Sequence, residues 1–220
     1  TVGQIAERTT EISASGNKTI TKDIERKVYG TGNNENGSLG IGGNTNAKTL
    51  TELTLPDIVE GENNDPDNVG AIINRPSVKY IKSGTYNTTL MLTDGTIWSV
   101  GKNTNGELGN GTNDNSMAFV QGLTHVKTED TTNTENENPD DVGVSIAHPL
   151  ENVLAIGRNN SLNTAVVLEN GDIYITGNNS YSQITNETEE NTNYYVPMRY
   201  IQTNCPEEIE MEKGQTRSLT

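Results

Sequence analysis

One stretch of the sequence occurs three times, and this repeat limits the fold more than any other feature. The copies align on Gly32, Gly101 and Gly177, which lie 69 and 76 residues apart. The first two copies read VYGTGNNENGSLGIG and IWSVGKNTNGELGNG, and the third, IYITGNNSYSQITNE, has lost the second half of the pattern. Self-similarity at a long period indicates a repeat architecture.

Four short apolar stretches accompany each copy. They mix β-branched and aromatic residues and are bounded by Gly, Asn, Asp or Pro, which is typical of strands. The expected strands are 12–16, 19–21, 28–29 and 49–55, then 78–84, 88–93, 97–100 and 118–123, then 153–157, 164–168, 173–176 and 196–201. No stretch has the apolar periodicity of a helix. The sequence predicts an all-β fold of three four-stranded units, each the size of one β-propeller blade.

Dipeptides between the second and third strands predict tight hairpins. Asp94-Gly95 in the second copy and Asn170-Gly171 in the third are typical of two-residue turns with positive φ angles. The first copy has Ile24 to Lys27 in this place, so we expect a different turn there.

Two polar, acidic insertions separate the units. They share a pattern, PDNVGAIINRP from Pro66 and PDDVGVSIAHP from Pro139, so we expect both to end in the same local structure. The apolar residues of this pattern are expected to pack on the adjacent blade, and the acidic tips to stay in solvent. The predicted divisions are blade 1 at 8–56, an insertion at 57–76, blade 2 at 77–123, an insertion at 124–149, blade 3 at 150–202 and a tail at 203–220.

The repeat resembles that of the regulator of chromosome condensation repeat family. The resemblance rests on TLMLTDGTIWSVGKNTNGELGNG in the second copy, VYGTGNNENGSLGIG in the first and AVVLENGDIYITGNN in the third. It covers the chain from Ile12 to Ile201 apart from the insertions. Members of that family fold as β-propellers, commonly with seven blades. The resemblance therefore implies propeller blades and a protein-interaction module.

The chain departs from the family pattern in three ways. Asn87-Thr88 and Asn163-Thr164 replace the usual His-Ser before the second strand, the insertions lengthen the repeat, and only three units are present. Closed propellers have about four to eight blades, so three blades cannot close a ring. We expect either a piece of a longer protein or a ring that several copies of the chain complete.

The tail and the composition suggest where such a chain works. From Cys205 the sequence reads CPEEIEMEKGQTRSLT, which resembles the start of bacterial immunoglobulin-like domains, and a terminal strand packed on the last blade is the alternative. The abundance of Asn and Thr favours a bacterial extracellular type of protein, secreted or at the cell surface.

The charge of the chain weighs against several classes of function. The chain has 30 acidic and 15 basic residues, and its net charge of −15 disfavours binding to nucleic acid or to anionic membranes. No stretch approaches the roughly 18 apolar residues of a transmembrane helix, and no signal peptide is expected. Cys205 is the single cysteine, so we expect neither an intrachain disulfide nor a cysteine-based metal site.

The repeated Gly/Asn loops are interpreted as structural. A phosphate cradle would need a helix after the loop, and here strands follow. We expect the glycines to allow close backbone approach or unusual φ angles, and the asparagines to bond neighbouring backbone. The residues given this structural role are Gly32, Gly101, Gly177, Asn33, Asn103, Asn178, Trp98, Gly106, Leu108 and Gly109, of which Trp98 is expected to be buried.

Catalysis and cofactor binding have little support. Of the two histidines, His125 lies near a strand end and His148 aligns with Arg75 in the other insertion, which favours a packing or surface role. No recognisable carboxylate pair or activated nucleophile occurs. We predict no enzyme activity and no cofactor. Calcium is the alternative, because the acidic tips offer oxygen ligands although no twelve-residue calcium loop is present. The candidate ligands are Asp65, Asp67, Asp140 and Asp141.

The predicted function is a non-enzymatic scaffold that binds another protein, neighbouring domains or copies of the same chain through loops on a rigid frame. The expected contact residues in the insertions are Asp65, Asp67, Asn68, Glu135, Glu137 and Asp140. Two alternatives stay open. A glycan-binding adhesin would need exposed aromatic platforms, for which Tyr181, Tyr194 and Tyr195 are the candidates, and a purely structural spacer in a surface fibre would bind no soluble ligand.

Overall fold

The computed structural model describes residues 9–56, 77–127, 145–157, 162–185 and 189–198. These residues form strands, turns and loops, and none belongs to a helix long and apolar enough to cross a membrane. The strands are β1 (Thr9–Ser15), β2 (Lys18–Asp23), β3 (Val28–Gly32), β4 (Ala47–Glu52), β5 (Val78–Ser83), β6 (Asn87–Leu92), β7 (Ile97–Gly101), β8 (Ser116–Gln121), β9 (Leu123–Lys127), β10 (Ser145–Pro149), β11 (Val153–Ile156), β12 (Asn163–Leu168), β13 (Ile173–Gly177) and β14 (Thr192–Pro197). The predicted all-β, blade-type fold is confirmed.

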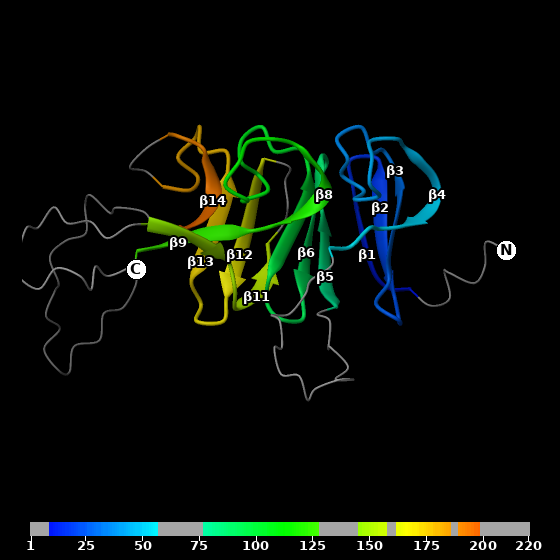
Figure 1. Cartoon of the computed structure of the whole chain (residues 1–220), viewed down its shortest axis with the longest axis horizontal. Coiled ribbons are helices and arrows are strands. Elements are labelled where there is room, and N and C mark those ends of the chain that lie inside the picture. The colour runs from blue at the N-terminus through cyan, green and yellow to red at the C-terminus, as the bar shows by residue number, and fades with distance from the viewer. Residues whose placement is uncertain (1–8, 57–76, 128–144, 158–161, 186–188, 199–220) are drawn as a thin grey trace, which may run out of the picture.

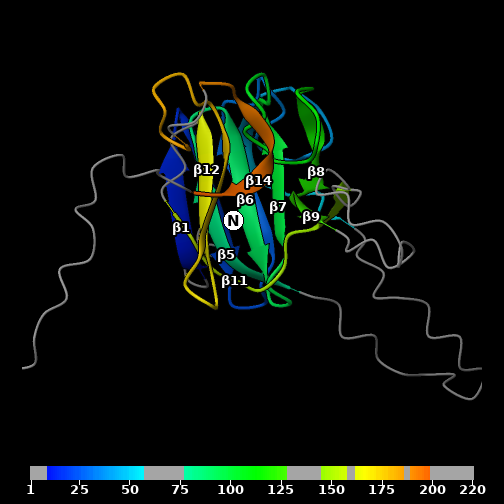
Figure 2. The ribbon, with the colours of Figure 1, turned by 90° about the vertical axis from the view of Figure 1, so that its left-hand side faces the viewer.

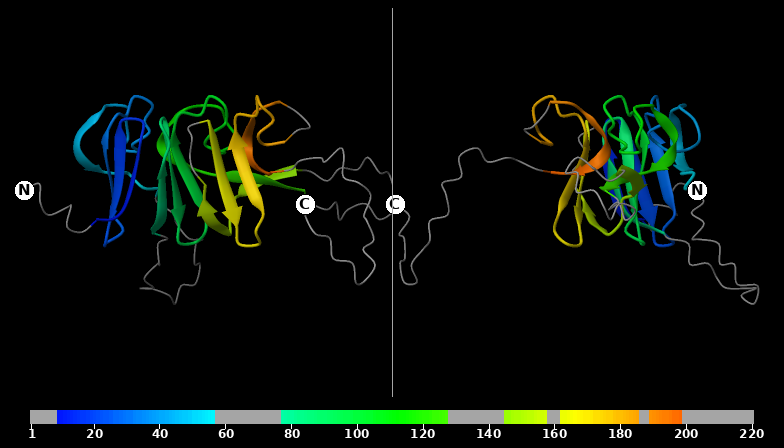
Figure 3. Two further views of the ribbon diagram at one scale, coloured as in Figure 1. Left: turned by 180° about the vertical axis from the view of Figure 1, so that it is seen from behind. Right: turned by 60° about the vertical axis from the view of Figure 1, so that its left-hand side comes forward.

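The strands form three sheets that stand side by side (Figure 1). Blade 1 has the order β1-β2-β3-β4, blade 2 the order β5-β6-β7-β8, and blade 3 contains β11 to β14. Blade 2 lies between the other two. Figures 2 and 3 show from other sides that the Gly/Asn loops, which connect the third and fourth strands, gather at one end of the blades.

The third strand of each blade ends at the glycine on which the repeats align, Gly32, Gly101 or Gly177. Just before this glycine the pairing register with the fourth strand shifts, and the glycine itself pairs with the first residue of that strand. The fourth strands therefore begin at 47, 116 and 192, two to four residues earlier than predicted. The prediction followed the apolar residues, whereas the pairing begins at the glycine.

The hairpins that follow the second strands differ from the predicted two-residue turns. In blade 2 the Leu92 N–H donates to the carbonyl of Thr96 (3.0 Å), which leaves a three-residue loop. Only its last residue, Gly95, has a positive φ angle (80°), and Gly171 takes the same place in blade 3 (90°). A three-residue loop needs one such residue, whereas a two-residue type I′ turn needs two.

Blade 1 has the same three-residue turn, so the expectation of a different turn was wrong. Here the Asp23 N–H donates to the carbonyl of Lys27 (3.0 Å), and Arg26 takes the place of the glycine at a φ of 65°. A side chain in this left-handed region costs about 1–2 kcal/mol, which the closed hairpin tolerates.

A further hairpin extends blade 3 to six strands, in the order β10-β9-β14-β13-β12-β11. β9 follows blade 2 directly and pairs with β14 in parallel through Thr124 and Tyr195, and β10 pairs antiparallel with β9. β10 lies in the second insertion, where the Ile of the shared pattern was expected to pack on the adjacent blade. That residue, Ile146, is 45% exposed, because it lies on the outermost strand of the sheet.

The apolar core lies between the blades, in two clusters. β6 of the middle blade is buried along its whole length, because neighbouring blades cover both of its faces. The cluster between blades 1 and 2 contains Ile20, Val28, Leu39, Ala47, Leu53, Val78, Ile81, Leu90, Leu92, Val100 and Phe119. The cluster between blades 2 and 3 contains Met91, Ile97, Leu150, Val153, Ile156, Val166 and Tyr195.

Candidate functional site

A buried asparagine fixes the shape of each Gly/Asn loop. The Oδ1 of Asn103 accepts the N–H of Leu108 (2.8 Å), and its Nδ2 donates to the carbonyl of Thr112 (2.8 Å). Asn34 makes the corresponding bonds in blade 1. In blade 3, Asn179 accepts the equivalent N–H but donates to a carbonyl six residues further on instead of nine. All three residues are fully buried. Their polar groups are used within the loops, so the loops form a rigid frame.

The equivalents of Asn103 are one residue later than the sequence analysis placed them. Asn34 and Asn179, rather than Asn33 and Asn178, lie two residues after the aligned glycines, as Asn103 does. The side chain of Asn178 still accepts a backbone N–H two residues further on (3.2 Å). A count from the aligned glycine, instead of the first Asn after it, would have found both positions.

We expect Asn103→Ala to lower the free energy of unfolding by about 2–3 kcal/mol, because it leaves the buried N–H of Leu108 without an acceptor. Asn113 is an exposed asparagine of the same loop, so Asn113→Ala is the control and should change stability by less than about 0.5 kcal/mol. Urea unfolding followed by circular dichroism measures both. Equal losses in the two variants would contradict the buried-clamp role.

The glycines at the ends of the third strands lie tightly against the backbone. Gly32, Gly101 and Gly177 have φ angles of 106°, 119° and 109°. A Cβ at any of them would overlap a carbonyl oxygen in the turn between the first and second strands. The carbonyls concerned are those of Asn17, Tyr86 and Leu162.

In blades 1 and 2, the glycine of the loop's Leu-Gly pair lies against an aromatic ring of the next blade. A Cβ on Gly40 would overlap the ring of Phe119 in β8, and one on Gly109 would overlap the ring of Tyr195 in β14. Phe119 is 6% exposed and Tyr195 is fully buried. Blade 3 has Thr185 at this position. The contact therefore joins each blade to the one that follows it in the chain.

Two threonines, each the second residue of the second strand in its blade, also join the blades. The Thr88 hydroxyl donates to the carbonyl of Ser38 (2.6 Å), and the Thr164 hydroxyl donates to the carbonyl of Glu107 (2.9 Å). Each bond runs from the second strand of one blade to the Gly/Asn loop of the blade before it. Gly106, next to Glu107, also accepts a blade 3 hydroxyl at its carbonyl (2.7 Å). From the sequence, these threonines were noted only because they differ from the repeat motif that the chain resembles, and their contacts between blades were not predicted.

The aromatic residues singled out from the sequence lie in different environments. Trp98, expected to be buried, is partly exposed and packs at the edge of the first cluster. Tyr195 is fully buried, so it cannot serve as a glycan platform. Tyr194 packs edge-on against His125, with ring centroids 4.0 Å apart. Tyr181 alone of the three glycan candidates is well exposed, at 90%.

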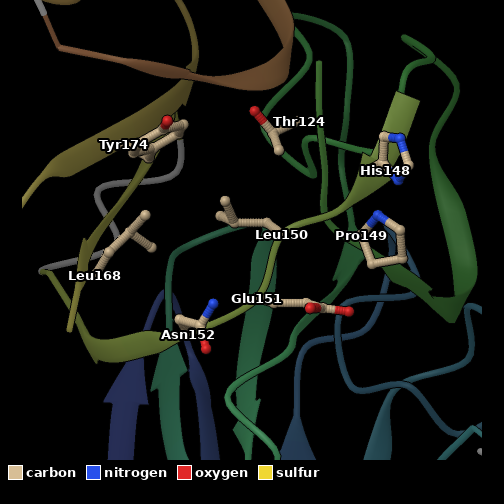
Figure 4. Close-up of a pocket in the computed structure, with 8 residues that line it drawn as sticks. All are labelled: Thr124, His148, Pro149, Leu150, Glu151, Asn152, Leu168 and Tyr174. Atoms are coloured by element: carbon tan, nitrogen blue, oxygen red, sulfur yellow. The ribbon is translucent and has the colours of Figure 1, made fainter. Parts of the chain in front are cut away.

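A groove of about 290 Å³ opens between the β9–β10 hairpin and blade 3 (Figure 4). Leu150 lies at its centre and is 2% exposed. Leu168 and Tyr174 lie on one side of Leu150, and His148 and Pro149 lie on the other. The eight residues that line the groove are Thr124, His148, Pro149, Leu150, Glu151, Asn152, Leu168 and Tyr174.

Hydrogen bonds to two blades hold the walls of the groove. The N–H of Leu150 donates to the carbonyl of Gly122 at the end of blade 2 (2.9 Å). The Thr124 hydroxyl donates to the carbonyl of Tyr195 in blade 3 (2.8 Å), and the carbonyl of Asn152 accepts a backbone N–H from blade 3 (2.8 Å). The groove is therefore preformed.

The described charges are unevenly distributed among the blades. Described residues 9–56 carry five acidic and five basic side chains, and residues 77–122 carry three of each. Blade 3 with its hairpin has five acidic residues and one basic residue among those described. The acidic residues are Glu151, Glu169, Asp172, Glu189 and Glu190, and the basic residue is Lys127. The groove thus lies on the acidic blade, with Glu151 at its rim.

Lys18 and Tyr195 are buried titratable residues that lie between blades and do not line the groove. Burial lowers the pKa of Lys18 to about 7. Burial raises the pKa of Tyr195 well above its usual range. Ser99 and Thr164 lie close to the Tyr195 hydroxyl and partly offset this rise, although neither forms a hydrogen bond of good geometry with it.

The contact and calcium residues predicted from the sequence lie outside the described residues. They are Asp65, Asp67, Asn68, Glu135, Glu137, Asp140 and Asp141. Within the described part of the chain, no three His, Cys, Asp or Glu side chains are grouped to hold a metal ion. Both assignments stay predictions, as do the domain boundaries. The described ends of the second insertion contribute Thr124, His148 and Pro149 to one wall of the groove.

No protein-family profile and no curated protein sequence matches the chain. Solved structures do match its fold. Human WBSCR16 has a TM-score of 0.59 and 14% identity, over 87% of this chain and 39% of that one. Prp20p from Saccharomyces cerevisiae, described with its binding properties to Gsp1p and histones, has a TM-score of 0.57 and 15% identity, over 87% and 38%. Yeast RCC1 (Prp20) bound to Kap60 has a TM-score of 0.56 and 16% identity, over 87% and 37%.

The chain spans less than two fifths of each of these proteins. At 14–16% identity, the likeness concerns the fold, and it agrees with the three sheets and with the loops at their ends. The chain therefore has the fold of RCC1-like β-propeller blades.

Proposed function

We propose that this chain is a non-enzymatic protein-binding scaffold and that its binding surface is the groove side of blade 3. The observation that carries this proposal is the preformed groove at the added hairpin, held by hydrogen bonds to blades 2 and 3. Pockets on a rigid frame that combine an apolar floor with a few polar groups are the usual form of a binding site.

The solved structures of similar fold add support. Prp20p is described with binding to Gsp1p and histones, and yeast RCC1 is seen bound to Kap60. Related blades thus belong to proteins that bind other proteins, although fold alone does not fix function. The Asn- and Thr-rich composition favours a place in a bacterial secreted or cell-surface protein. The proposal includes no cofactor, with calcium at the acidic tips as the alternative.

A peptide-display selection tests the proposal. A random peptide library is selected on the immobilised whole chain, and the selected peptides are mapped by amide chemical shifts. Peptides should shift the groove residues and lose binding to the variant His148→Ala/Glu151→Ala, in which two exposed rim side chains are removed. The variant Glu35→Ala/Glu52→Ala, altered at exposed positions of blade 1, is the control and should bind normally. Peptides that map consistently to another surface would contradict the groove assignment.

The glycan alternative keeps one supporting observation, the exposed ring of Tyr181 in the third Gly/Asn loop. A glycan array with Tyr181→Ala as the control variant tests it. Binding that disappears in this variant would favour the adhesin function over the protein scaffold.

A further inference from the structure

Resting on the proposed function, we infer that the groove binds the side chain of an arginine from a basic segment of the partner protein. The size of the groove limits which ligands fit it. At about 290 Å³ it lies at the lower end of the range for small-molecule sites, which begins near 300 Å³. It therefore fits one long side chain better than a cofactor or an oligosaccharide.

The floor of the groove suits the apolar stem of such a side chain. Leu150 is buried at the centre, with the partly buried Leu168 and Tyr174 beside it. The methylene groups of arginine pack on apolar surface of this kind while the charged head stays at the rim. The ring of Tyr174 enlarges the apolar surface on which this stem packs.

The rim supplies acceptors for the charged head. Glu151 brings an exposed carboxylate to the rim, and the exposed Asn152, which follows it in the chain, adds an amide side chain. A carboxylate accepts two parallel N–H groups of a guanidinium, and a charge-assisted bond of this kind is about twice as strong as a neutral one. An apolar ligand at this rim would instead take water from Glu151 without replacing its hydrogen bonds.

The charge around the groove also favours an arginine from a basic segment. Blade 3 has five acidic residues and one basic residue among those described, whereas blades 1 and 2 are each balanced. Glu169 lies close to the groove, because its N–H donates to the carbonyl of Asn152 (2.8 Å). Complementary charge raises the association rate of a basic partner and repels an acidic one.

The test uses the capped tripeptides Gly-Arg-Gly and Gly-citrulline-Gly as probes, since citrulline has nearly the same shape without the charge. Binding to the whole chain is followed by amide chemical shifts. The arginine peptide should shift the amides of Leu150, Glu151 and Asn152, bind at least tenfold more tightly than the citrulline peptide, and weaken as salt is raised. Glu151→Gln should weaken it about tenfold, whereas Glu35→Gln, an equal change of charge on blade 1, should leave it unchanged.

Equal affinity for the two peptides, or equal effects of the two Glu→Gln variants, would overturn the inference. Shifts confined to other surfaces, or occupation of the groove by a neutral sugar in a parallel titration, would also overturn it. If the arginine peptide fails while peptides selected from the random library still map to the groove, the scaffold function stands and only the arginine assignment is wrong. If both fail, the groove is not a binding site.

Discussion

Gly109→Ala is expected to lower the free energy of unfolding by about 2–5 kcal/mol. Two costs combine in this substitution. The residue has a φ angle of 67°, where a side chain costs about 1–2 kcal/mol. In addition, the new Cβ would overlap the buried ring of Tyr195, and forcing an extra carbon into a filled core costs about 1–3 kcal/mol. Thermal and urea unfolding of the whole chain measure the loss.

Gly42→Ala is the matched control for the backbone cost. Gly42 has a φ angle of 79°, and no atom beyond Gly42 and its two chain neighbours lies within 4 Å of the position that its Cβ would take. This variant should lose only about 1–2 kcal/mol. The difference between the two variants isolates the contact between the blades, and similar losses would show that the ring does not fill the space beside Gly109.

A double-mutant cycle adds a second check. Tyr195→Ala alone should cost about 3–5 kcal/mol, because it empties a fully buried site between blades 2 and 3. In the background of Tyr195→Ala, the substitution Gly109→Ala should cost much less, since the ring that it meets is gone. The two effects are therefore expected to be strongly non-additive.

The same contact shows what the sequence could and could not predict. The fold class follows from local patterns, because strand residues and turn glycines recur at three places along the chain. The partner of Gly109 is a tyrosine 86 residues further on, in a strand of the next blade. No local pattern contains that pairing. The glycine was therefore recognised as structural, but the blade contact it serves was not.

The groove was only partly predictable, for a related reason. The second insertion was expected to contribute contacts, and its described ends do form one wall of the groove. The strand character of β9 and β10 was missed, because an acidic, Asn-rich segment interrupts the hairpin and β9 pairs with a strand about 70 residues away. Tyr174 and Leu168 were assigned to strands, but only the added hairpin places them in a groove.

The second large expected effect is a gain in stability when a buried lysine is replaced. Lys18 is 3% exposed between blades 1 and 2, and its Nζ donates to the carbonyls of Asn87 (2.8 Å) and Thr85 (3.4 Å). It takes the repeat position that Asn87 and Asn163 hold in the other blades. Burial lowers its pKa from 10.5 to about 7, which corresponds to roughly 4–5 kcal/mol against the charged form.

Lys18→Met is accordingly expected to raise the free energy of unfolding at pH 6 by about 3–4 kcal/mol. Methionine has similar length and no charge to desolvate. The carbonyl of Asn87 keeps a hydrogen bond from the N–H of Gly84 (3.0 Å), so the loss of the amine does not leave that acceptor unpaired. Lys48→Met, at an exposed lysine of β4, is the control and should change stability little.

The pH dependence distinguishes the removal of a buried charge from better packing as the cause of this gain. Between pH 7 and about 10 the unfolded chain binds a proton on Lys18 that the folded chain does not, so the wild type should gain stability as the pH rises through this window. Below pH 7 the free energy of unfolding of the wild type should stay at its lower value. The variant lacks this proton, so its advantage should be largest at pH 6, fall to about a third of that value by about pH 9.5 and nearly vanish only above about pH 11. An advantage that is constant across this range would mean that methionine packs better and that the buried charge carries no penalty.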